Sequence, residues 1–410
     1  MVLPFLLAVA IVILSAKLSG WASNLINQPT VLGKLLIGLI LGPSLFNIFG
    51  SDYFHSANVN EILHLLGELG VILLMFVAGL EIDLNEMRKS GLAATLVGTS
   101  GVIVPMILGA LTSLAFGYGV TPAIFIGVVL TATSVSISAQ TLMELGRLRS
   151  RAGLTILGAA VVDDVLGIAV LSAFVALALG GEGGGIGSIV LVVVQMLVFL
   201  GVAALAAFYV VPRILDFSKR MPVSQPMMAT LFVLILLYAW ASETWGQVAP
   251  ITGAFVLGAG LSGSRFKHDI EQGIHATVYA LFVPIFLVNI GLTADLTKLS
   301  SNDIGLTIAI CLVAIVSKII GCGAGAKLSG MTWKESLRIG VGMISRGEVG
   351  LIVAGVGVTK GVIGNNVFTV SVVMVLVSTL VTPPLLRLVF QDVPADNEPS
   401  APTKAKAAAT

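Results

Sequence analysis

Runs of apolar residues long enough to cross a lipid bilayer recur along almost the whole chain. A spanning helix needs about 20 such residues, because the hydrocarbon core is about 30 Å thick. We predict thirteen spans, at residues 2–20, 31–49, 62–80, 91–117, 121–144, 151–180, 186–211, 226–243, 247–263, 274–292, 303–328, 334–358 and 364–389. Only 10% of the residues are charged, against about a quarter in soluble proteins. The sequence therefore predicts an all-α polytopic membrane domain in residues 1–390 and a disordered tail, rich in Pro, Ala and Lys, at 391–410.

The positive charges predict how these spans are oriented, because cytoplasmic loops carry an excess of Lys and Arg. With the N-terminus outside, 18 of the 22 Lys and Arg residues fall on the inner side. Lys298 and Lys360 fall outside, and Lys318 and Arg346 lie within spans. We expect an outer N-terminus and a cytoplasmic tail. The first span lacks a basic leading region, and no transit-peptide features are seen, which favours a bacterial inner membrane.

Several classes of function are disfavoured. The formal net charge of +1 argues against a nucleic-acid partner, which would require a basic face. The sequence contains no GxxxxGK[ST] loop, so we expect neither nucleotide binding nor ATP-driven pumping. The four histidines lie in or near loops without a metal-binding pattern, and we expect no enzyme activity and no cofactor.

A repeated pattern indicates internal symmetry. Residues 79–84 and 291–296 both read G-L-x-x-D-L, and the glycines at 33, 38 and 42 correspond to those at 253, 258 and 263. The two copies are seven spans apart, so the second copy crosses the membrane in the opposite direction. Inverted repeats of this kind are typical of secondary transporters, whose substrate sites lie near the midplane.

Five ionisable residues lie inside predicted spans. Each costs about 2.5–3.5 kcal/mol at the bilayer centre, so unpaired they would cost about 12–17 kcal/mol together. Adjacent positions on a helix diverge by about 100°, so two neighbouring aspartates cannot both satisfy one partner. We predict that one aspartate pairs with the lysine while the other stays open to a small, hard cation. For the Arg and Glu, a buried ion pair that holds helices together is the alternative explanation. The five residues are Asp163, Asp164, Lys318, Arg346 and Glu348.

Two spans contain segments that favour unwound backbone. Residues 131–138 in the fifth span carry five hydroxyl side chains, and residues 342–350 in the twelfth are rich in glycine. Helices break in this way where they line a cavity, and the freed carbonyl groups can then face an ion. Hydrogen bonding between intact helices is the alternative explanation for the hydroxyls.

Together these motifs resemble the monovalent cation:proton antiporter-2 family, the NapA/Kef-type exchangers. The matching stretches are residues 42–43, 76–81, 131–134, 161–164, 318 and 345–348. The resemblance implies an NhaA/NapA-like bundle of thirteen helices. Spans two to six and nine to thirteen would be inverted five-helix repeats with crossed broken helices, and a mobile core would move like an elevator within a homodimer.

The resemblance also implies roles for individual residues. Asp164 would be the main carboxylate for the cation and the proton, and Asp163 would pair with Lys318 when the site holds no cation. A lysine at position 318 beside paired aspartates marks the electrogenic branch of the family. The implied sodium ligands are Asp164, Asp163 and Thr131, and the supporting residues of the ion path are Thr131, Thr133, Ser134, Ser345, Arg346 and Glu348.

The function expected from these features is electrogenic Na+(Li+)/H+ antiport, with monovalent cations and protons as substrates and membrane lipid as the surroundings. Two departures from the Kef pattern favour sodium: no large regulatory domain follows the last span, and Asp163 stands where a glutamine is common. K+/H+ exchange remains the first alternative. A channel or a sensor built on the same fold is the second.

Overall fold

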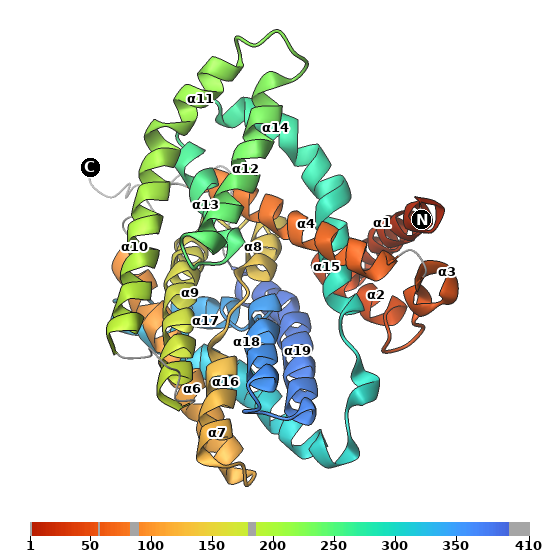
Figure 1. Cartoon of the computed structure of the whole chain (residues 1–410), viewed down its shortest axis with the longest axis vertical. Coiled ribbons are helices and arrows are strands. Elements are labelled where there is room, and N and C mark those ends of the chain that lie inside the picture. Colours follow the sequence, from red (N-terminus) through yellow and green to blue (C-terminus); the bar gives the residue numbers. More distant parts are fainter. Residues whose placement is uncertain (1, 56–57, 83–89, 179–185, 393–410) are drawn as a thin grey trace, which may run out of the picture.

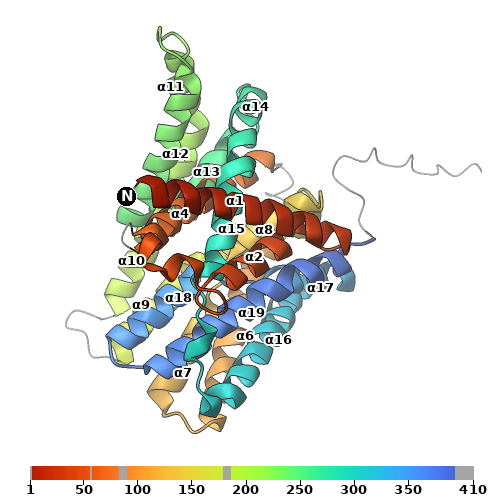
Figure 2. The same ribbon diagram turned by 90° about the vertical axis from the view of Figure 1, so that its right-hand side faces the viewer.

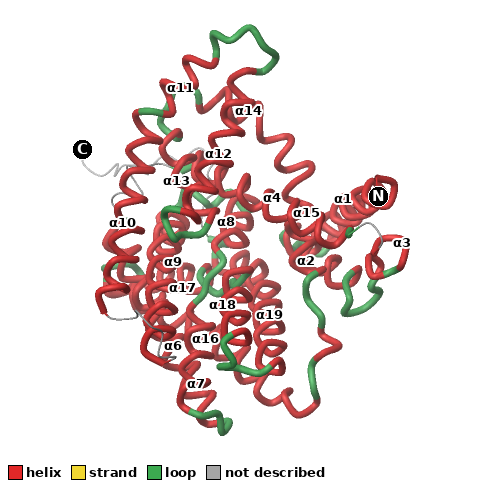
Figure 3. The backbone as a smooth tube through the Cα atoms, in the orientation of Figure 1, coloured by secondary structure: helices red, strands yellow, loops and turns green. Residues whose placement is uncertain are grey.

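The computed structural model describes residues 2–55, 58–82, 90–178 and 186–392, and every regular element within these ranges is helical (Figure 3). Almost all of the expected disordered tail lies outside the described residues, as does the end of the first G-L-x-x-D-L copy, at 83–84. The all-helical architecture predicted from the apolar runs is confirmed.

Within the described residues, ten helical segments are long and apolar enough to cross a membrane, and three of the shorter helices are apolar as well. A π-helical turn at Val278–Phe282 joins α14 to α15. The helices are α1 (Val2–Leu25), α2 (Thr30–Leu41), α3 (Asp52–His55), α4 (Val59–Glu81), α6 (Gly91–Ala115), α7 (Val120–Thr131), α8 (Val135–Glu144), α9 (Arg151–Ala178), α10 (Ile186–Tyr209), α11 (Val211–Ser218), α12 (Pro226–Thr244), α13 (Pro250–Leu261), α14 (Lys267–Thr277), α15 (Val283–Leu292), α16 (Ile304–Leu328), α17 (Trp333–Gly342), α18 (Glu348–Thr359) and α19 (Asn365–Val389).

Two of the predicted spans are longer than the helices observed. The second and ninth spans were expected at 31–49 and 247–263, but α2 and α13 contain only 12 residues each. Helix α2 stops early because Gly42 is extended, and the residue before a proline disfavours helical backbone. The fifth span divides into α7 and α8, and the twelfth divides into α17 and α18, which confirms the breaks predicted from the hydroxyl-rich and glycine-rich stretches.

The helices pack as two groups. The site group comprises α6–α9 and α16–α19, in which α6 packs against α7, α9 and α16. The flanking group comprises α1, α2, α4 and α10–α15, in which α4 packs against α13 and α15, and α2 packs against α1 and α15. Most of the site group occupies the lower half of Figure 1. In Figure 2, α1 runs across the middle of the view, on the face turned toward the viewer.

Glycines allow backbones of the flanking group to touch. A methyl group on Gly38 of α2 would overlap the carbonyl oxygen of Val288 in α15, and one on Gly258 of α13 would overlap that of Phe76 in α4. The partner helices carry matching glycines. A methyl group on Gly291 of α15 would overlap the carbonyl oxygen of Leu35 in α2, and one on Gly79 of α4 would overlap that of Phe255 in α13. The helix pairs α2–α15 and α4–α13 therefore make equivalent contacts at positions that the predicted repeat aligns.

A few polar contacts join the two groups. The Glu144 carboxylate, at the end of α8, accepts hydrogen bonds from the backbone N–H groups of Thr30 (2.9 Å) and Val31 (3.3 Å) at the start of α2. A helix N-terminus carries unpaired N–H groups and a partial positive charge, so it binds a carboxylate well. This contact fastens the end of the site group to the flanking group.

We expect Gly38→Ala and Gly258→Ala each to destabilise the protein by about 1–3 kcal/mol, because the added methyl group forces packed backbones apart. The measurement is the midpoint of thermal unfolding in detergent. Gly201→Ala is the matched control, since a methyl group on this glycine of α10 meets no other atom within 4 Å. Equal midpoints for all three variants would contradict the close-packing argument.

Candidate ion-binding site

Two broken helices cross at the centre of the site group. In Figure 1 an extended stretch joins α7 to α8 and passes beside α18. The Ser134 N–H donates to the Ser345 carbonyl (2.8 Å), and the Ser345 hydroxyl donates back to the Ser134 carbonyl (2.5 Å). The Ser138 hydroxyl donates to the carbonyl of Gly342, the last residue of α17 (2.5 Å). Side chains and the extended backbone of the crossing segments thus form hydrogen bonds with backbone groups that the helix breaks leave unpaired.

Arg346 supplies a buried positive charge at this crossing. Its guanidinium donates to the carbonyl of Leu130, near the end of α7 (3.0 Å), and to that of Ile344 (2.9 Å). The Thr379 hydroxyl of α19 donates a hydrogen bond to the backbone carbonyl of Arg346. Carbonyl ends of helices carry a partial negative charge, which a cation compensates. Arg346 therefore offsets the negative ends of the half-helices at the crossing.

The adjacent aspartates lie on α9, which crosses the site group beside the broken helices. Asp163 is buried, and its Oδ1 lies 3.0 Å from the Nζ of Lys318 on α16, which is also buried. Burial of an unpaired charge is costly, so each group stabilises the other. Gly101 of α6 lies close to this pair, but a methyl group there would overlap the Sγ of Cys322 at 2.6 Å and would meet the pair only at ordinary van der Waals distance.

Asp164 points to a different part of the site. Its Oδ2 accepts a hydrogen bond from the hydroxyl of Thr252 on α13, at 2.8 Å. Asp164 is less buried than Asp163. The two carboxylates therefore have different partners, which follows from their divergence around the helix.

A small cavity of about 40 Å³ lies beside the two aspartates. Because a water needs about 15 Å³ of such space, the cavity has room for a small cation and a ligand water. Oxygen atoms are the ligands that hard cations prefer. The residues that line it are Thr131, Ala132, Thr133, Asp163, Asp164, Gly167, Ile168, Leu171, Ala249, Val349 and Val353.

The structure brings most of the predicted residues together, in two layers. Asp163, Asp164, Thr131 and Thr133 line the cavity, and Lys318 contacts it through Asp163. Ser134, Ser345 and Arg346 lie at the crossing instead, where they hold the two broken helices. Glu348 begins α18, but its side chain lies outside the described part of the structure, so the suggested pair with Arg346 stays a prediction.

Thr252 is the contact that the sequence did not reveal. It belongs to the ninth span, three spans from the aspartates, and no local motif links an Ile-Thr-Gly stretch to a carboxylate. The only available signal was its place just after Pro250, at the start of a short helix.

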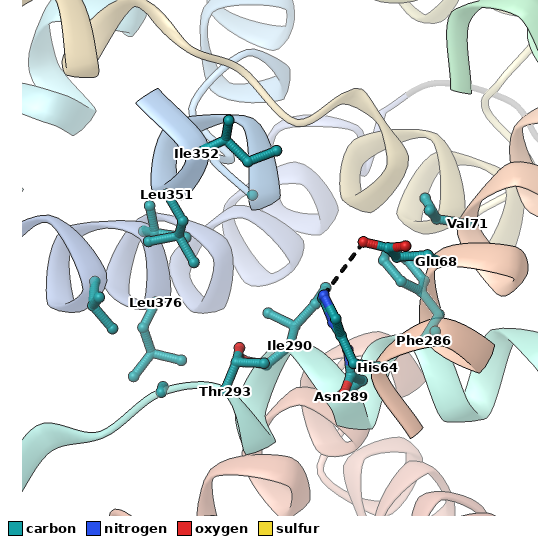
Figure 4. Close-up of a pocket in the computed structure, with 15 residues that line it drawn as sticks. His64, Glu68, Val71, Phe286, Asn289, Ile290, Thr293, Leu351, Ile352 and Leu376 are labelled. Atoms are coloured by element: carbon teal, nitrogen blue, oxygen red, sulfur yellow. Dashed lines mark hydrogen bonds and ion pairs between the residues drawn. The ribbon is translucent and has the colours of Figure 1, made fainter. Parts of the chain in front are cut away.

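A larger cavity of about 300 Å³ separates α4 and α15 from α18 and α19 (Figure 4). On its α4 side, His64 lies 3.3 Å from Glu68 and shares a hydrogen bond with Asn289 (3.2 Å). Most of the remaining lining is apolar, and neither ion-site aspartate contributes to it. The cavity therefore marks space between the two helix groups rather than the ion site itself.

We expect Lys318→Met to destabilise the protein by about 3–5 kcal/mol, because it leaves Asp163 buried without its partner. Adding Asp163→Asn should recover much of this loss, since the uncompensated charge is then gone. The measurement is again the thermal midpoint in detergent. Lys298→Met is the control, because it breaks an exposed ion pair with Asp295, and such pairs contribute about 0–1 kcal/mol. A loss in that control as large as in Lys318→Met would contradict the argument.

Comparison with known proteins finds a matching family model and relatives that cover most of the chain. The family model described as "Sodium/hydrogen exchanger, transmembrane" matches residues 11–391. The Na+/H+-K+ antiporter GerN of Bacillus cereus is 37% identical over 386 residues, which cover 94% of this chain and 96% of GerN. A Na+/H+ antiporter of Enterococcus hirae is 34% identical, over 94% of this chain and 98% of that protein.

Solved structures show the same fold. The sodium proton antiporter MjNhaP1 from Methanocaldococcus jannaschii superposes with a TM-score of 0.66, covering 94% of this chain and 96% of its own. Its sequence identity is 16%, so this likeness concerns the fold alone. The fit to the family, the relatives and the fold accords with the expectation of a transporter that is not an enzyme and uses no cofactor. The chain belongs to the sodium/hydrogen exchanger family, whose members are multi-pass membrane transporters of monovalent cations and protons.

Proposed function

We propose that this chain is an electrogenic Na+(Li+)/H+ antiporter of the Asp-Asp/Lys branch, working by alternating access. One observation carries the proposal: Asp163 is paired with Lys318, while Asp164 reaches the same small cavity and accepts a hydrogen bond from the hydroxyl of Thr252. A carboxylate of this kind can bind either a cation or a proton, but not both. That competition couples the two fluxes.

The buried pair explains how more than one proton can move for each sodium. A cation that draws both aspartates to itself removes the partner of Lys318. A buried ammonium without a counter-charge releases its proton readily. Asp164 and Lys318 would each exchange a proton for one Na+, so that each cycle moves net charge.

The packing supports a sliding movement of the site group against the flanking group. Contacts are extensive within each group and sparse between them. The equivalent glycine contacts of α2–α15 and α4–α13 support an inverted repeat of two five-helix units within a thirteen-span bundle. In this proposal the N-terminus is outside, the C-terminus is cytoplasmic, the membrane is a bacterial inner membrane, and the flanking group is the fixed part of a homodimer.

K+/H+ exchange is the second candidate. The printed name of GerN includes both sodium and potassium, and oxygen ligands alone do not separate the two ions. Reconstitution into liposomes with an imposed pH gradient distinguishes them, with internal pH followed by a dye as Na+, Li+ or K+ is added. A response to Na+ and Li+ but not to K+ supports the first proposal, and an equal response to K+ supports the second.

Asp164→Asn should abolish this exchange, because an amide can neither release a proton nor supply the negative charge that a cation requires. Dye-detected proton flux on addition of Na+ is the measurement, with folding checked by size-exclusion profile. Asp269→Asn changes a carboxylate of α14 that pairs with Lys219, and should exchange at the wild-type rate. Robust transport by Asp164→Asn would refute the assignment of the site.

Lys318→Gln should still transport but without net charge movement, since glutamine can hydrogen-bond to Asp163 and carries no exchangeable proton. The measurement is the effect of clamping the voltage with a potassium ionophore on the rate of exchange. An effect as large as in the wild-type protein would limit Lys318 to a structural role.

A further inference from the structure

The hydroxyl of Thr252 and the carboxylate of Asp164 belong to different helix groups. Asp164 lies on α9, which packs against α6 and α17 in the site group. Thr252 lies on α13, which packs against α4, α10 and α12 in the flanking group. Their hydrogen bond of 2.8 Å therefore joins the proposed ion-binding carboxylate, in the site group, to the flanking group.

The position of Thr252 is fixed within the flanking group. Gly258, further along α13, touches the backbone of α4, and Gly253, next to Thr252, lies against Ser242 and the backbone of Tyr238 in α12. Thr252 is itself buried. Because α13 is held so closely on two sides, its hydroxyl cannot follow α9 when the groups slide past each other.

The wall of the ion cavity shows the same division. Ala249, just before α13, lines the cavity beside both aspartates, while the other lining residues belong to the site group. The wall formed by Ala249 and the hydroxyl donor Thr252 thus stay in place when the site group moves.

The strength of this tie depends on what Asp164 carries. A hydroxyl donates about twice as strongly to an ionised carboxylate as to a neutral group. When a proton neutralises Asp164 or a cation neutralises its charge, the bond to Thr252 weakens. The tie is therefore strongest when the site is empty and ionised.

We propose that Thr252 is a positioning residue that holds the empty, ionised Asp164 against the flanking group, so that the site crosses the membrane only when loaded. An antiporter whose empty site crosses freely returns without its second substrate, and the two fluxes then separate. This inference rests on the proposed function of Asp164.

The test compares Thr252→Val, which keeps the shape and removes the hydroxyl, with Thr252→Ser, which keeps the donor. Thr252→Ala is a second variant without a hydroxyl, in case valine disturbs folding. Thr155→Val is the matched control, since it removes a buried hydroxyl of α9 that bonds only to the carbonyl of Arg151 within its own helix. Full-length protein is reconstituted into liposomes loaded with radiolabelled Na+.

Two quantities are measured with the voltage clamped: the number of protons moved per Na+, and the efflux of Na+ at equal alkaline pH on both sides, where protons are scarce. Thr252→Val and Thr252→Ala should move fewer protons per Na+, with alkaline efflux raised about tenfold, the change expected from one lost charge-assisted hydrogen bond. Thr252→Ser and Thr155→Val should match the wild-type protein in both quantities.

A wild-type ratio and a wild-type efflux in both hydroxyl-free variants would overturn the inference. Slower exchange with an unchanged number of protons per Na+ would also overturn it, because that outcome indicates a structural role alone. Failure of the underlying function looks different: the wild-type protein would then show no cation-dependent proton flux, or Asp164→Asn would transport normally.

Discussion

The buried pair of Asp163 and Lys318 is the interaction on which the rest of this site depends. Two opposite charges with almost no exposure to solvent persist in a membrane interior only where each faces the other at hydrogen-bond distance. Their pairing fixes the rotation of α9 against α16. Once that rotation is set, the helical geometry turns the next residue, Asp164, away from the pair and toward the small cavity and the hydroxyl of Thr252.

A second constraint comes from the backbone itself. Within a bilayer, interrupted helices survive only if their free carbonyl and N–H groups find partners inside the protein. Here the serine pair Ser134–Ser345, the Ser138 hydroxyl and the Arg346 guanidinium provide those partners. The crossing is thus a polar centre, and the side chains that satisfy the broken ends are not the ones that line the cavity beside it.

Much of this organisation could be predicted from the sequence, because the signals involved are local. Apolar runs locate the helices, and hydroxyl-rich and glycine-rich stretches locate the breaks. The cost of burying charge predicts that an aspartate must meet Lys318, although the residues alone left open which aspartate it would be. Helix ends such as that of α2 were missed, since a Gly-Pro step stops a helix within an otherwise apolar run.

The remaining features depend on contacts between distant segments, which leave no local pattern. The hydroxyl of Thr252 meets Asp164 across 88 positions of sequence, and Glu144 caps α2 across more than a hundred. The cavity likewise exists only after helices from several parts of the chain have assembled. Such contacts follow from the three-dimensional packing, and only the types of residue involved can be anticipated.

The close contacts of α2 with α15 and of α4 with α13 each join an early helix to a late one. This has a consequence for how the chain assembles during synthesis. Neither α2 nor α4 finds its close backbone partner until the ribosome has made residues some two hundred positions later. Asp163 likewise enters the bilayer 155 residues ahead of Lys318. The first half of the nascent protein can pack α6 against α7 and α9 by itself, but the close backbone contacts of α2 and α4 and the pairing of Asp163 form only when the second half arrives.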